Sequence, residues 1–527
     1  MQSLSKILSF LSSFVFLGSF SYAATITGTV KGPDGAPFEG AFVQAQNIKS
    51  RVTVSVLSNK EGHYRVEKLP EGEYELRIRA IGYKGDPRTG VNLKTEQNAS
   101  FDFALQKGMV RWSDLTLYQG KKLLPEAPGK QTLVRTCFGC HGFESRMAAV
   151  QRDEDGWRDR VNYMRDAERV RLNPEQEIEI VSYLTKTFGP DSQLPPSPVD
   201  LPAYKDLALH FSDEAMKIVY VEYDLPGPGR FPFDANPDKE GNVWMPYMSQ
   251  LNEVAKLNPK TAEVQEFKLP NQPQPRMSLH SAVAGPDGTV WFTEQNTNRL
   301  GELDPQTKEI TEHQDVVPPA AGGMLGTIPS KHTVRIDPRG MVWATGTPFS
   351  SFDPKTKKFT EYPDPPNTYG IALDKDGSHV WFDGFTPEGK IYEVDAKTGK
   401  LMGGWAPPTH GLPRRITVAE DGIVWFAEYS GGKVGRFDPK TETFKEYQLP
   451  GQEPTPYAFA VDQEGGIWYS SDMMDVIGRL DANTGKVVEY PYTHFEATMR
   501  EFNCDSQGRV WFASPANNKV GYLYLAK

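Results

Sequence analysis

Three residues close together in the chain have the types and the spacing of a redox cofactor site. Cys137 and Cys140 are separated by two residues, and His141 follows directly. Two thiols at this spacing add to the two vinyl groups of one porphyrin, and the imidazole beside them becomes an axial ligand of the iron. The sequence therefore predicts one covalently bound haem c, with Cys137 and Cys140 as attachment residues and His141 as the proximal iron ligand.

The second axial ligand of this haem is expected to be a methionine, because no histidine occurs between Gly142 and Leu209. Met147 lies only six residues after His141, which is short for reaching the opposite face of the porphyrin. Met164 lies in a stretch with helical character, and we predict it as the distal ligand. The alternatives for the distal ligand are Met147, a different residue, or an open sixth position on the iron. Ligation by histidine and methionine raises the reduction potential and favours electron transfer over oxygen chemistry.

The residues around this motif predict a small helical module, residues 108–190. Asn173 followed by Pro174 is a strong helix start, with an N-cap side chain, proline in the first turn and acidic residues next to it. Apolar residues then recur at helical spacing up to Gly189, namely Ile178, Val181, Leu184 and Phe188. The segment resembles a class I cytochrome c, which implies an all-α domain of this size around the haem.

The first 23 residues predict a secretory signal peptide. Lys6 is followed by an apolar run from Ile7 to Phe20, which is too short to span a bilayer, and small residues precede Ala24. We therefore expect cleavage before Ala24 and export to the periplasm, because covalent haem is normally attached outside the bacterial cytoplasm. No later stretch is apolar enough to cross a membrane, so an integral membrane protein is not expected. The net charge of −10 argues against nucleic acid as a partner.

Residues 24–107 alternate short period-two runs with glycine turns and predict a small β-sandwich. This stretch resembles the carboxypeptidase regulatory-like domain. The likeness rests on Gly28, Asp34-Gly35, Gly40-Ala41, Gly62, Tyr64, Leu69-Pro70, Gly72, Tyr74 and Gly82-Tyr83. The resemblance implies a fold and no catalysis, and the sequence of this segment contains no cluster of residues that would support a reaction.

A proline-rich linker, residues 191–214, precedes a repetitive region that covers residues 215–527. Seven tryptophans mark the repeats: Trp244, Trp291, Trp343, Trp381, Trp425, Trp468 and Trp511. Seven units of four short strands predict a seven-bladed β-propeller. Val219–Leu225 is expected to supply the strand that the last unit lacks, which would remove an open edge. The whole chain is thus expected to be a multidomain, mainly β protein.

Two positions in every repeat are expected to line one mouth of the central channel. The first lies eight residues before the turn glycine and holds Phe233, His280, His332, Tyr369, Arg414, Tyr457 and Arg500. The second lies three residues after the tryptophan and holds Tyr247, Glu294, Gly346, Gly384, Glu428, Ser471 and Ser514. The turn lies midway between the two positions, so they should be cross-strand neighbours that pair His280 with Glu294, and Arg414 with Glu428. Arginines at the mouth of an acidic protein would attract an anionic ligand.

The repeats resemble the virginiamycin B (streptogramin) lyase family, most clearly in Gly285–Glu294 and Asp421–Glu428. The resemblance implies a lactone-opening elimination by histidine and glutamate with Mg²⁺ at the channel mouth. It makes His280, His332 and Glu294 the first catalytic candidates, with Arg414 and Glu428 as further candidates. The sequence departs from the family where Gly346 stands in place of a second glutamate and where several ring positions hold Arg or Tyr.

Together these features favour an exported haem-c oxidoreductase or electron-transfer protein. Its propeller would bind a small organic, anionic substrate, and its haem would pass electrons to a soluble cytochrome or a membrane electron-transport protein. The fusion supports this interpretation, because a lyase alone has no use for a redox centre. Two alternatives are a Mg²⁺-dependent carbon–oxygen lyase or lactonase with an accessory cytochrome, and a non-enzymatic electron carrier with interaction modules.

Overall fold

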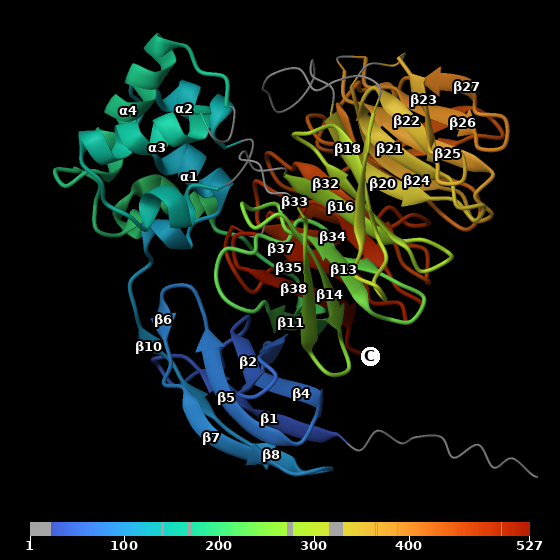
Figure 1. The fold of residues 1–527 in the computed structure, drawn as a ribbon. Coiled ribbons are helices and arrows are strands. Elements are labelled where there is room, and N and C mark those ends of the chain that lie inside the picture. The colour runs from blue at the N-terminus through green and yellow to red at the C-terminus, as the bar shows by residue number, and fades with distance from the viewer. Residues whose placement is uncertain are drawn as a thin grey trace, which may run out of the picture.

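The computed structural model describes residues 23–138, 142–166, 170–270, 278–315, 330–363, 365, 367–386, 388–496 and 498–527 (Figure 1). Strands dominate: they form a β domain near the N-terminus and a propeller in the C-terminal part, with helices between the two in sequence. This agrees with the mainly β fold class that the sequence predicts. The predicted signal peptide lies outside the described residues except for its last residue. Within the described ranges, no helix combines the length and the apolarity needed to cross a bilayer.

The N-terminal β domain stacks two layers of strands. One layer has the order β4-β1-β8, with β9 also paired to β1, and the other has the order β3-β2-β5-β7. The strands are β1 (Ala24–Lys31), β2 (Phe42–Asn47), β3 (Val52–Leu57), β4 (His63–Leu69), β5 (Gly72–Arg79), β6 (Tyr83–Lys84), β7 (Arg88–Leu93), β8 (Asn98–Ser100), β9 (Phe103–Ala104) and β10 (Gln106–Lys107). Alternate side chains enter the core, as Tyr64 and Val66 do on either side of the exposed Arg65.

Helices follow between residues 112 and 188. They are η1 (Trp112–Asp114), α1 (Leu117–Leu123), α2 (Lys130–Thr136), η2 (Glu144–Ala148), α3 (Glu154–Asp166) and α4 (Pro174–Phe188). The start of α4 is as predicted, because the Asn173 side chain accepts a hydrogen bond from the Gln176 N–H. Buried side chains of these helices, among them Leu133, Phe143 and Trp157, form one apolar cluster. A class I cytochrome c fold for this module stays a prediction.

The proline-rich segment that follows packs against the helices. It contains the short turns η3 (Pro198–Asp200), η4 (Pro202–Leu207) and η5 (Asp213–Lys217). The Trp112 indole N–H donates to the Pro195 carbonyl at 2.9 Å, and the Gln119 side-chain amide donates to the Leu207 carbonyl at 2.9 Å. These bonds hold the segment on the helical module.

Six four-stranded sheets form the first six blades of the propeller. Blade 1 has β12 (Asn236–Pro237), β13 (Val243–Pro246), β14 (Glu253–Asn258) and β15 (Glu263–Lys268), and blade 2 has β16 (Leu279–Ala284), β17 (Val290–Glu294), β18 (Arg299–Leu303) and β19 (Ile310–Gln314). Blade 3 has β20 (Ser330–Ile336), β21 (Val342–Thr347), β22 (Phe349–Asp353) and β23 (Lys358–Tyr362), and blade 4 has β24 (Thr368–Leu373), β25 (His379–Gly384), β26 (Ile391–Asp395) and β27 (Lys400–Trp405). Blade 5 has β28 (Pro413–Val418), β29 (Val424–Glu428), β30 (Lys433–Asp438) and β31 (Thr443–Gln448), and blade 6 has β32 (Pro456–Val461), β33 (Gly466–Ser471), β34 (Val476–Asp481) and β35 (Val487–Pro491).

The seventh blade closes the propeller as the sequence predicts. It consists of β36 (Phe502–Cys504), β37 (Val510–Ser514), β38 (Lys519–Leu525) and the much earlier strand β11 (Ile218–Asp224). In β11, Val221 lies opposite Tyr522 of β38 on one side and opposite Val54 of β3 on the other. The N-terminal β domain therefore continues the seventh blade into one eight-stranded sheet, which protects the edge of the blade.

A repeated turn explains why each unit folds into the same inner hairpin. In blade 1 the Gly241 N–H donates to the Asp238 carbonyl at 3.0 Å, and Gly241 has a φ of 84°, which favours glycine. The Asp238 carboxylate accepts a hydrogen bond from the Trp244 indole N–H at 3.0 Å. Blade 6 repeats this bond from Trp468 to Asp462 at 2.8 Å. The glycine turn recurs in all seven blades, and in blades 1, 3, 6 and 7 the bond from tryptophan to aspartate also fixes the packing of the hairpin.

Candidate functional site

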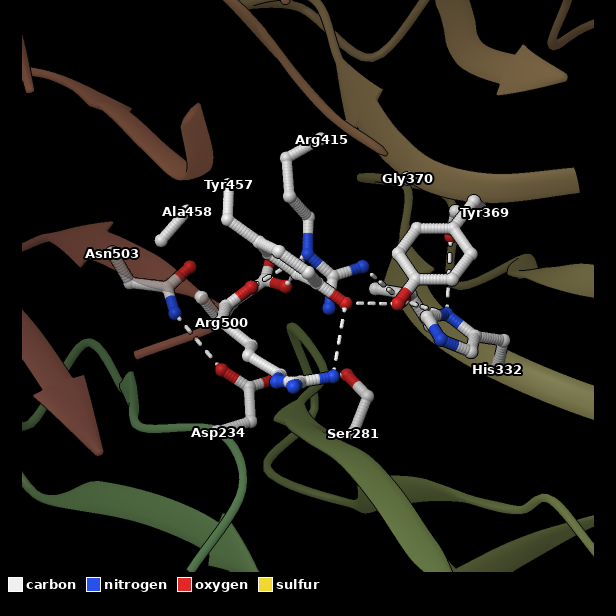
Figure 2. A network of polar contacts seen from close by, with 12 residues as sticks. Asp234, Ser281, His332, Tyr369, Gly370, Arg415, Tyr457, Ala458, Arg500 and Asn503 are labelled. Atoms are coloured by element: carbon white, nitrogen blue, oxygen red, sulfur yellow. Dashed lines mark hydrogen bonds and ion pairs between the residues drawn. The ribbon is translucent and has the colours of Figure 1, made fainter. Parts of the chain in front are cut away.

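Seven side chains, one from each blade, meet in the centre of the propeller. We call them the channel ring: Phe233, His280, His332, Tyr369, Arg414, Tyr457 and Arg500. The ring centroids of Phe233 and His280 are 4.5 Å apart, those of His280 and His332 3.7 Å, and those of His332 and Tyr369 4.0 Å. The Tyr369 and Tyr457 hydroxyls are hydrogen-bonded, and the Arg500 guanidinium lies over both Tyr457 and Phe233 (Figure 2). The first of the two predicted ring positions is therefore correct.

A β-bulge in each of blades 2 to 6 lies at the channel-ring residue. In blade 2, Leu279 pairs with Glu294 and regular pairing resumes at Ala282 with Phe292, so the irregularity covers His280 and its neighbour. The same shift occurs at the ring residue of blades 3, 4, 5 and 6. Bulges redirect side chains and are frequent beside functional sites.

The bulges also show that the predicted cross-strand pairs are wrong. Glu294 lies opposite Leu279 rather than His280, and Glu428 lies opposite Pro413 rather than Arg414. Side chains of directly opposed residues share one face of a sheet, so neither glutamate shares a face with the ring residue of its blade. The predicted pairs would be opposite each other in a regular hairpin. The extra residue of the bulge shifts the pairing register by one, so the preceding residue takes the place opposite each glutamate.

Each of these two glutamates instead faces a glutamate on the outermost strand of its own blade. We call the pairs Glu294–Glu312 and Glu428–Glu446 the outer carboxyl sites. Burial, with the Glu312 carboxylate beside it, raises the pKa of Glu294 to about 8, although the Thr297 hydroxyl donates to Glu294 at 2.6 Å. Burial and the neighbouring Glu446 raise the pKa of Glu428 to about 7. Glu294 is therefore protonated at neutral pH.

Arg415, next to a channel-ring residue, is fully paired (Figure 2). It lies 2.7 Å from the Glu501 carboxylate, and it donates to the Arg500 carbonyl at 2.7 Å and to the Thr333 hydroxyl at 3.0 Å. Glu501 also accepts a hydrogen bond from Arg335 at 2.7 Å. Because these residues come from blades 3, 5 and 7, the network ties three blades together across the channel.

Arg414 is buried in a different way. Its side chain makes no hydrogen bond or ion pair with the described residues, and its Nε is without a partner there. Its guanidinium instead lies over four aromatic rings, at 3.8 Å from the centroid of Tyr429, 4.8 Å from Tyr457, 5.1 Å from Phe385 and 5.8 Å from Tyr369. Cation–π contacts of this kind stabilise a guanidinium but do not neutralise its charge.

The imidazoles of the ring are held neutral. Burial lowers the pKa of His280 and of His332 well below the usual range, and the nearby Arg415 adds to the effect in both. Arg500, Arg414 and Arg415 together outweigh the burial of Tyr457 and lower its pKa. The ring thus combines two neutral imidazoles, which are weaker bases than free histidine, with a phenol that is more acidic than free tyrosine.

Sequence reasoning missed the residues that accompany the ring. Phe385 and Tyr429 contact Arg414, and Asp472 lies 3.8 Å from Arg500. All three stand four residues after the tryptophan of their repeat, one position beyond the one predicted. The repeat alignment therefore contained this position, four residues after each tryptophan. It did not show the bulge that makes this position, rather than the one before it, accompany the channel ring.

Two of the three residues predicted to bind haem, Cys140 and His141, lie outside the described residues. Cys137 follows α2, its N–H donates to the Leu133 carbonyl at 2.8 Å, and its side chain packs against the apolar cluster of the helices. Phe138 and Phe143, on either side of the undescribed stretch, are buried with their ring centroids 5.9 Å apart.

The two methionine candidates differ in burial. Met164 lies on α3 and is half-buried, whereas Met147 lies in η2 and is part of the apolar cluster. The assignment of Met164 as distal ligand stays a prediction.

Residues just after the Cys-x-x-Cys-His motif contact the propeller near the channel ring. Glu496 accepts a hydrogen bond from the Ser145 N–H at 3.1 Å and forms an ion pair with Arg146 at 3.2 Å. The Arg146 guanidinium lies 5.6 Å from the centroid of the Phe231 ring, which stacks on the ring residue Phe233 at 6.4 Å. The helices thus lie beside the propeller (Figure 1) and contact it at Glu496 and Phe231.

The Mg²⁺ site implied by the lyase resemblance does not fit these residues. His280 and Glu294 lie on different faces of their hairpin, and Glu294 is a protonated acid beside Glu312. Across the ranges that the structure describes, no group of three or more His, Cys, Asp or Glu side chains is arranged to hold a metal ion. We therefore derive no step through Mg²⁺.

Comparison with known proteins bears on two parts of the chain. The sequence profile of the virginiamycin B lyase family matches residues 355–526, and that of the carboxypeptidase regulatory-like domain matches residues 25–106. No curated protein is similar enough to this chain to count as a match.

Solved structures of lyases resemble the propeller. Selenomethionine-substituted virginiamycin B lyase from Staphylococcus aureus is 24% identical, with a TM-score of 0.51 over 59% of this chain and 100% of that one. A streptogramin B lyase is 25% identical, with a TM-score of 0.52 over 60% of this chain and 100% of that one. A catalytically inactive histidine-to-alanine variant of the Staphylococcus aureus enzyme with quinupristin is 24% identical, with a TM-score of 0.50 over 59% of this chain and 100% of that one. The chain therefore carries a virginiamycin B lyase-like propeller and an N-terminal carboxypeptidase regulatory-like domain.

Proposed function

We propose that this chain is an exported, periplasmic oxidoreductase that binds a small organic substrate at the channel ring and passes its electrons to an external redox protein through a haem c. One observation carries the proposal: the residues that follow the Cys-x-x-Cys-His motif contact Glu496, four residues before Arg500 of the ring. A redox centre beside a ring of polar and aromatic side chains is the arrangement that electron removal from a molecule bound at that ring needs.

The residues near the motif fit a haem c. Cys137 and Cys140 offer two thiols at the attachment spacing, and His141 offers the axial imidazole. The buried Phe138 and Phe143 provide an apolar wall beside the motif. A haem held there would supply a one-electron acceptor, so that a substrate oxidised at the ring gives up its electrons singly to a soluble cytochrome or a membrane electron-transport protein.

The ring residues have roles that follow from their charge states. His280 and His332 are neutral, so either is able to take a proton that the substrate loses on oxidation. Arg500 and the fully buried Tyr457 contact each other and would orient the substrate by hydrogen bonds. Because the ring is buried between blades, these bonds form in a medium of low polarity and are stronger than in water.

The test uses the full-length protein with its haem oxidised and oxygen excluded. Small acids, lactones and alcohols are added in turn, and the absorption bands of reduced haem are followed. We expect one substrate class to reduce the haem, and we expect His332→Gln to slow this by about 100-fold, the lower range for loss of a general base. His313→Gln is the matched control, because His313 is largely buried in blade 2 and pairs with Glu302 away from the ring. An equal effect of both variants, or no effect of either, would contradict the proposal.

The likeness to virginiamycin B lyase favours a second candidate, an elimination reaction at the same propeller. A lyase consumes its substrate without changing the redox state of the haem. We would assign this function if turnover persists in Cys137→Ser, which cannot attach haem normally, and if no substrate reduces the haem of the unmodified chain. Electron exchange with a partner cytochrome in the absence of any turnover would leave the third candidate, a non-enzymatic carrier.

A further inference from the structure

Arg414 and Arg415 are adjacent in sequence and both buried, but only Arg415 has acceptors for its charge. Arg415 is held by Glu501, by a carbonyl and by a hydroxyl. Arg414 is only 9% exposed and makes no hydrogen bond or ion pair with the described residues. A buried charge without a counter-ion is costly, so such a group marks a place where a ligand supplies the missing charge.

None of the described acids near Arg414 forms an ion pair with it. Asp472 pairs with Arg500 at 3.8 Å and keeps a buried Oδ1 without a hydrogen-bond partner among the described residues, and Glu501 is shared by Arg415 and Arg335. Burial raises the pKa of Asp383 to about 8, so that this side chain is neutral at neutral pH and accepts a hydrogen bond from the Gly370 N–H. The protein therefore leaves a positive charge at Arg414 that none of these acids neutralises.

The surroundings of Arg414 also restrict the shape of its ligand. Tyr429, Tyr457, Phe385 and Tyr369 surround the guanidinium with aromatic rings. When aromatic rings contact the faces of a guanidinium, its N–H edge is the part that can bind a ligand. The N–H groups of that edge lie in one plane and match the two oxygens of a carboxylate. The rest of such a ligand would lie against the same aromatic side chains, which favours a flat, apolar body.

We propose that Arg414 is the receptor for the carboxylate of a small, flat organic acid, such as an aromatic or unsaturated acid, bound at the channel ring. A second buried atom lacks a partner at the same ring, namely Nδ1 of His280. It offers a further polar contact for a substituent of the acid. The proposal rests on the channel ring being the substrate site, as proposed above, but it requires no redox chemistry.

The test measures binding to the full-length haem protein at constant ionic strength, by calorimetry and by the shift of the unfolding temperature. The probes are benzoate, cinnamate and acetate, the neutral isostere benzamide, and inorganic phosphate. We expect benzoate or cinnamate to bind more tightly than acetate, and benzamide not to bind. We expect Arg414→Gln to weaken binding by on the order of tenfold or more, the loss that one charged hydrogen-bonded contact causes. Arg414→Lys should also bind more weakly, because an ammonium lacks the planar fork.

Arg479→Gln is the matched control, because Arg479 also lies over an aromatic ring but is paired with Asp462 and Glu464 away from the channel. It should bind benzoate like the unmodified chain. If Arg414→Gln fails to fold, Tyr429→Ala keeps the charge and opens the aromatic surround, and it should remove the preference for benzoate over acetate.

Three results would overturn the inference: no binding of any of the three acids at millimolar concentration, equal binding by Arg414→Gln, or phosphate binding as tightly as benzoate. The last would indicate a site for inorganic anions only. Binding without haem reduction by any substrate would refute the oxidoreductase function and leave this inference standing. Haem reduction by a neutral substrate, without binding of any carboxylate, would refute this inference and leave the oxidoreductase function standing.

Discussion

In blades 2 and 5 the inner hairpin contributes one residue to the channel ring and one glutamate to an outer carboxyl site, and burial shifts the pKa values of the two regions in opposite directions. The ring contains arginines and two imidazoles that burial keeps neutral. The outer carboxyl sites contain glutamates that burial keeps protonated, with pKa values of about 8 at Glu294 and about 7 at Glu428. One hairpin therefore separates a channel that contains arginines from buried carboxyl groups with raised pKa values inside the blade.

This difference shows how a repeat builds a site without breaking its own fold. The bulges direct His280 and Arg414 to the channel. Glu294 and Glu428, which lie opposite the preceding residues of the inner strands, stay within their blades. The two regions also respond to pH in opposite directions. A base with a lowered pKa destabilises the fold as the pH falls, whereas an acid with a raised pKa destabilises it as the pH rises.

The largest expected effect comes from the arginine that holds the ring together. Arg415→Met leaves the Glu501 carboxylate with one cation instead of two, in a site where Glu501 is only 8% exposed. Removing one partner of a buried ion pair typically costs about 3–5 kcal/mol. We expect a loss of this size in the free energy of unfolding, measured by chemical denaturation with tryptophan fluorescence.

Arg479→Met is the comparison for this variant. Arg479 keeps an ion pair at 2.7 Å with Asp462, but its side chain is 19% exposed and its second partner, Glu464, is 84% exposed. Ion pairs near the surface are worth about 1 kcal/mol or less. Equal losses for the two arginines would mean that the ring network has no special part in stability.

The next effect is the response of the outer carboxyl sites to alkali. Glu294 has its pKa raised from 4.5 to about 8, so its contribution to stability is complete below 4.5 and is lost as the pH rises through 8. Because each pKa unit corresponds to about 1.4 kcal/mol, Glu294→Gln should be more stable than the unmodified chain by up to roughly 5 kcal/mol at about pH 9. Denaturation midpoints from acid to alkaline pH measure this. A parallel pH profile in both proteins would refute the protonated pair.

The channel ring should show the opposite slope. His332 has its pKa lowered by burial and by Arg415, so the unfolded chain binds a proton below the usual histidine pKa while the folded chain does not. The contribution of His332 to the stability of the fold is complete above the usual histidine pKa. It decreases as the pH decreases, by up to about 2 kcal/mol at about pH 5. His332→Gln should flatten the acid side of the profile and leave the alkaline side unchanged. An unchanged acid side would mean that the imidazole takes up protons in the fold.

The sequence predicted more of the fold than of the site. Tryptophan spacing was enough for the propeller and for its closure by Val219–Leu225, because repeated turns and core residues recur at fixed distances. It was also enough to find the ring residues His280 and Arg414. It could not predict that Glu294 turns away from His280, because a bulge changes hydrogen-bond register without changing residue spacing. Nor could it predict that the residues after the Cys-x-x-Cys-His motif contact the propeller, because Ser145 and Arg146 meet Glu496, which is remote in sequence.

The smallest effect separates the two outer carboxyl sites from each other. In the Glu428 site the neighbouring Glu446 accepts hydrogen bonds from Thr409 and Lys433, at 2.6 and 2.7 Å. The Glu294 site also has a cation, because Arg299 lies 3.5 Å from Glu312, but Lys433 makes the closer ion pair, at 2.7 Å from Glu446. A backbone hydrogen bond from Gly411 and the charge of Lys433 offset part of the effect of burial, and the pKa of Glu428 rises to about 7, compared with about 8 for Glu294. Glu428→Gln should therefore gain about 1.4 kcal/mol less at alkaline pH than Glu294→Gln does, which corresponds to one pKa unit. In a Lys433→Met background the gain from Glu428→Gln at alkaline pH should increase, and an unchanged gain would show that the lysine has no part in setting the pKa of Glu428.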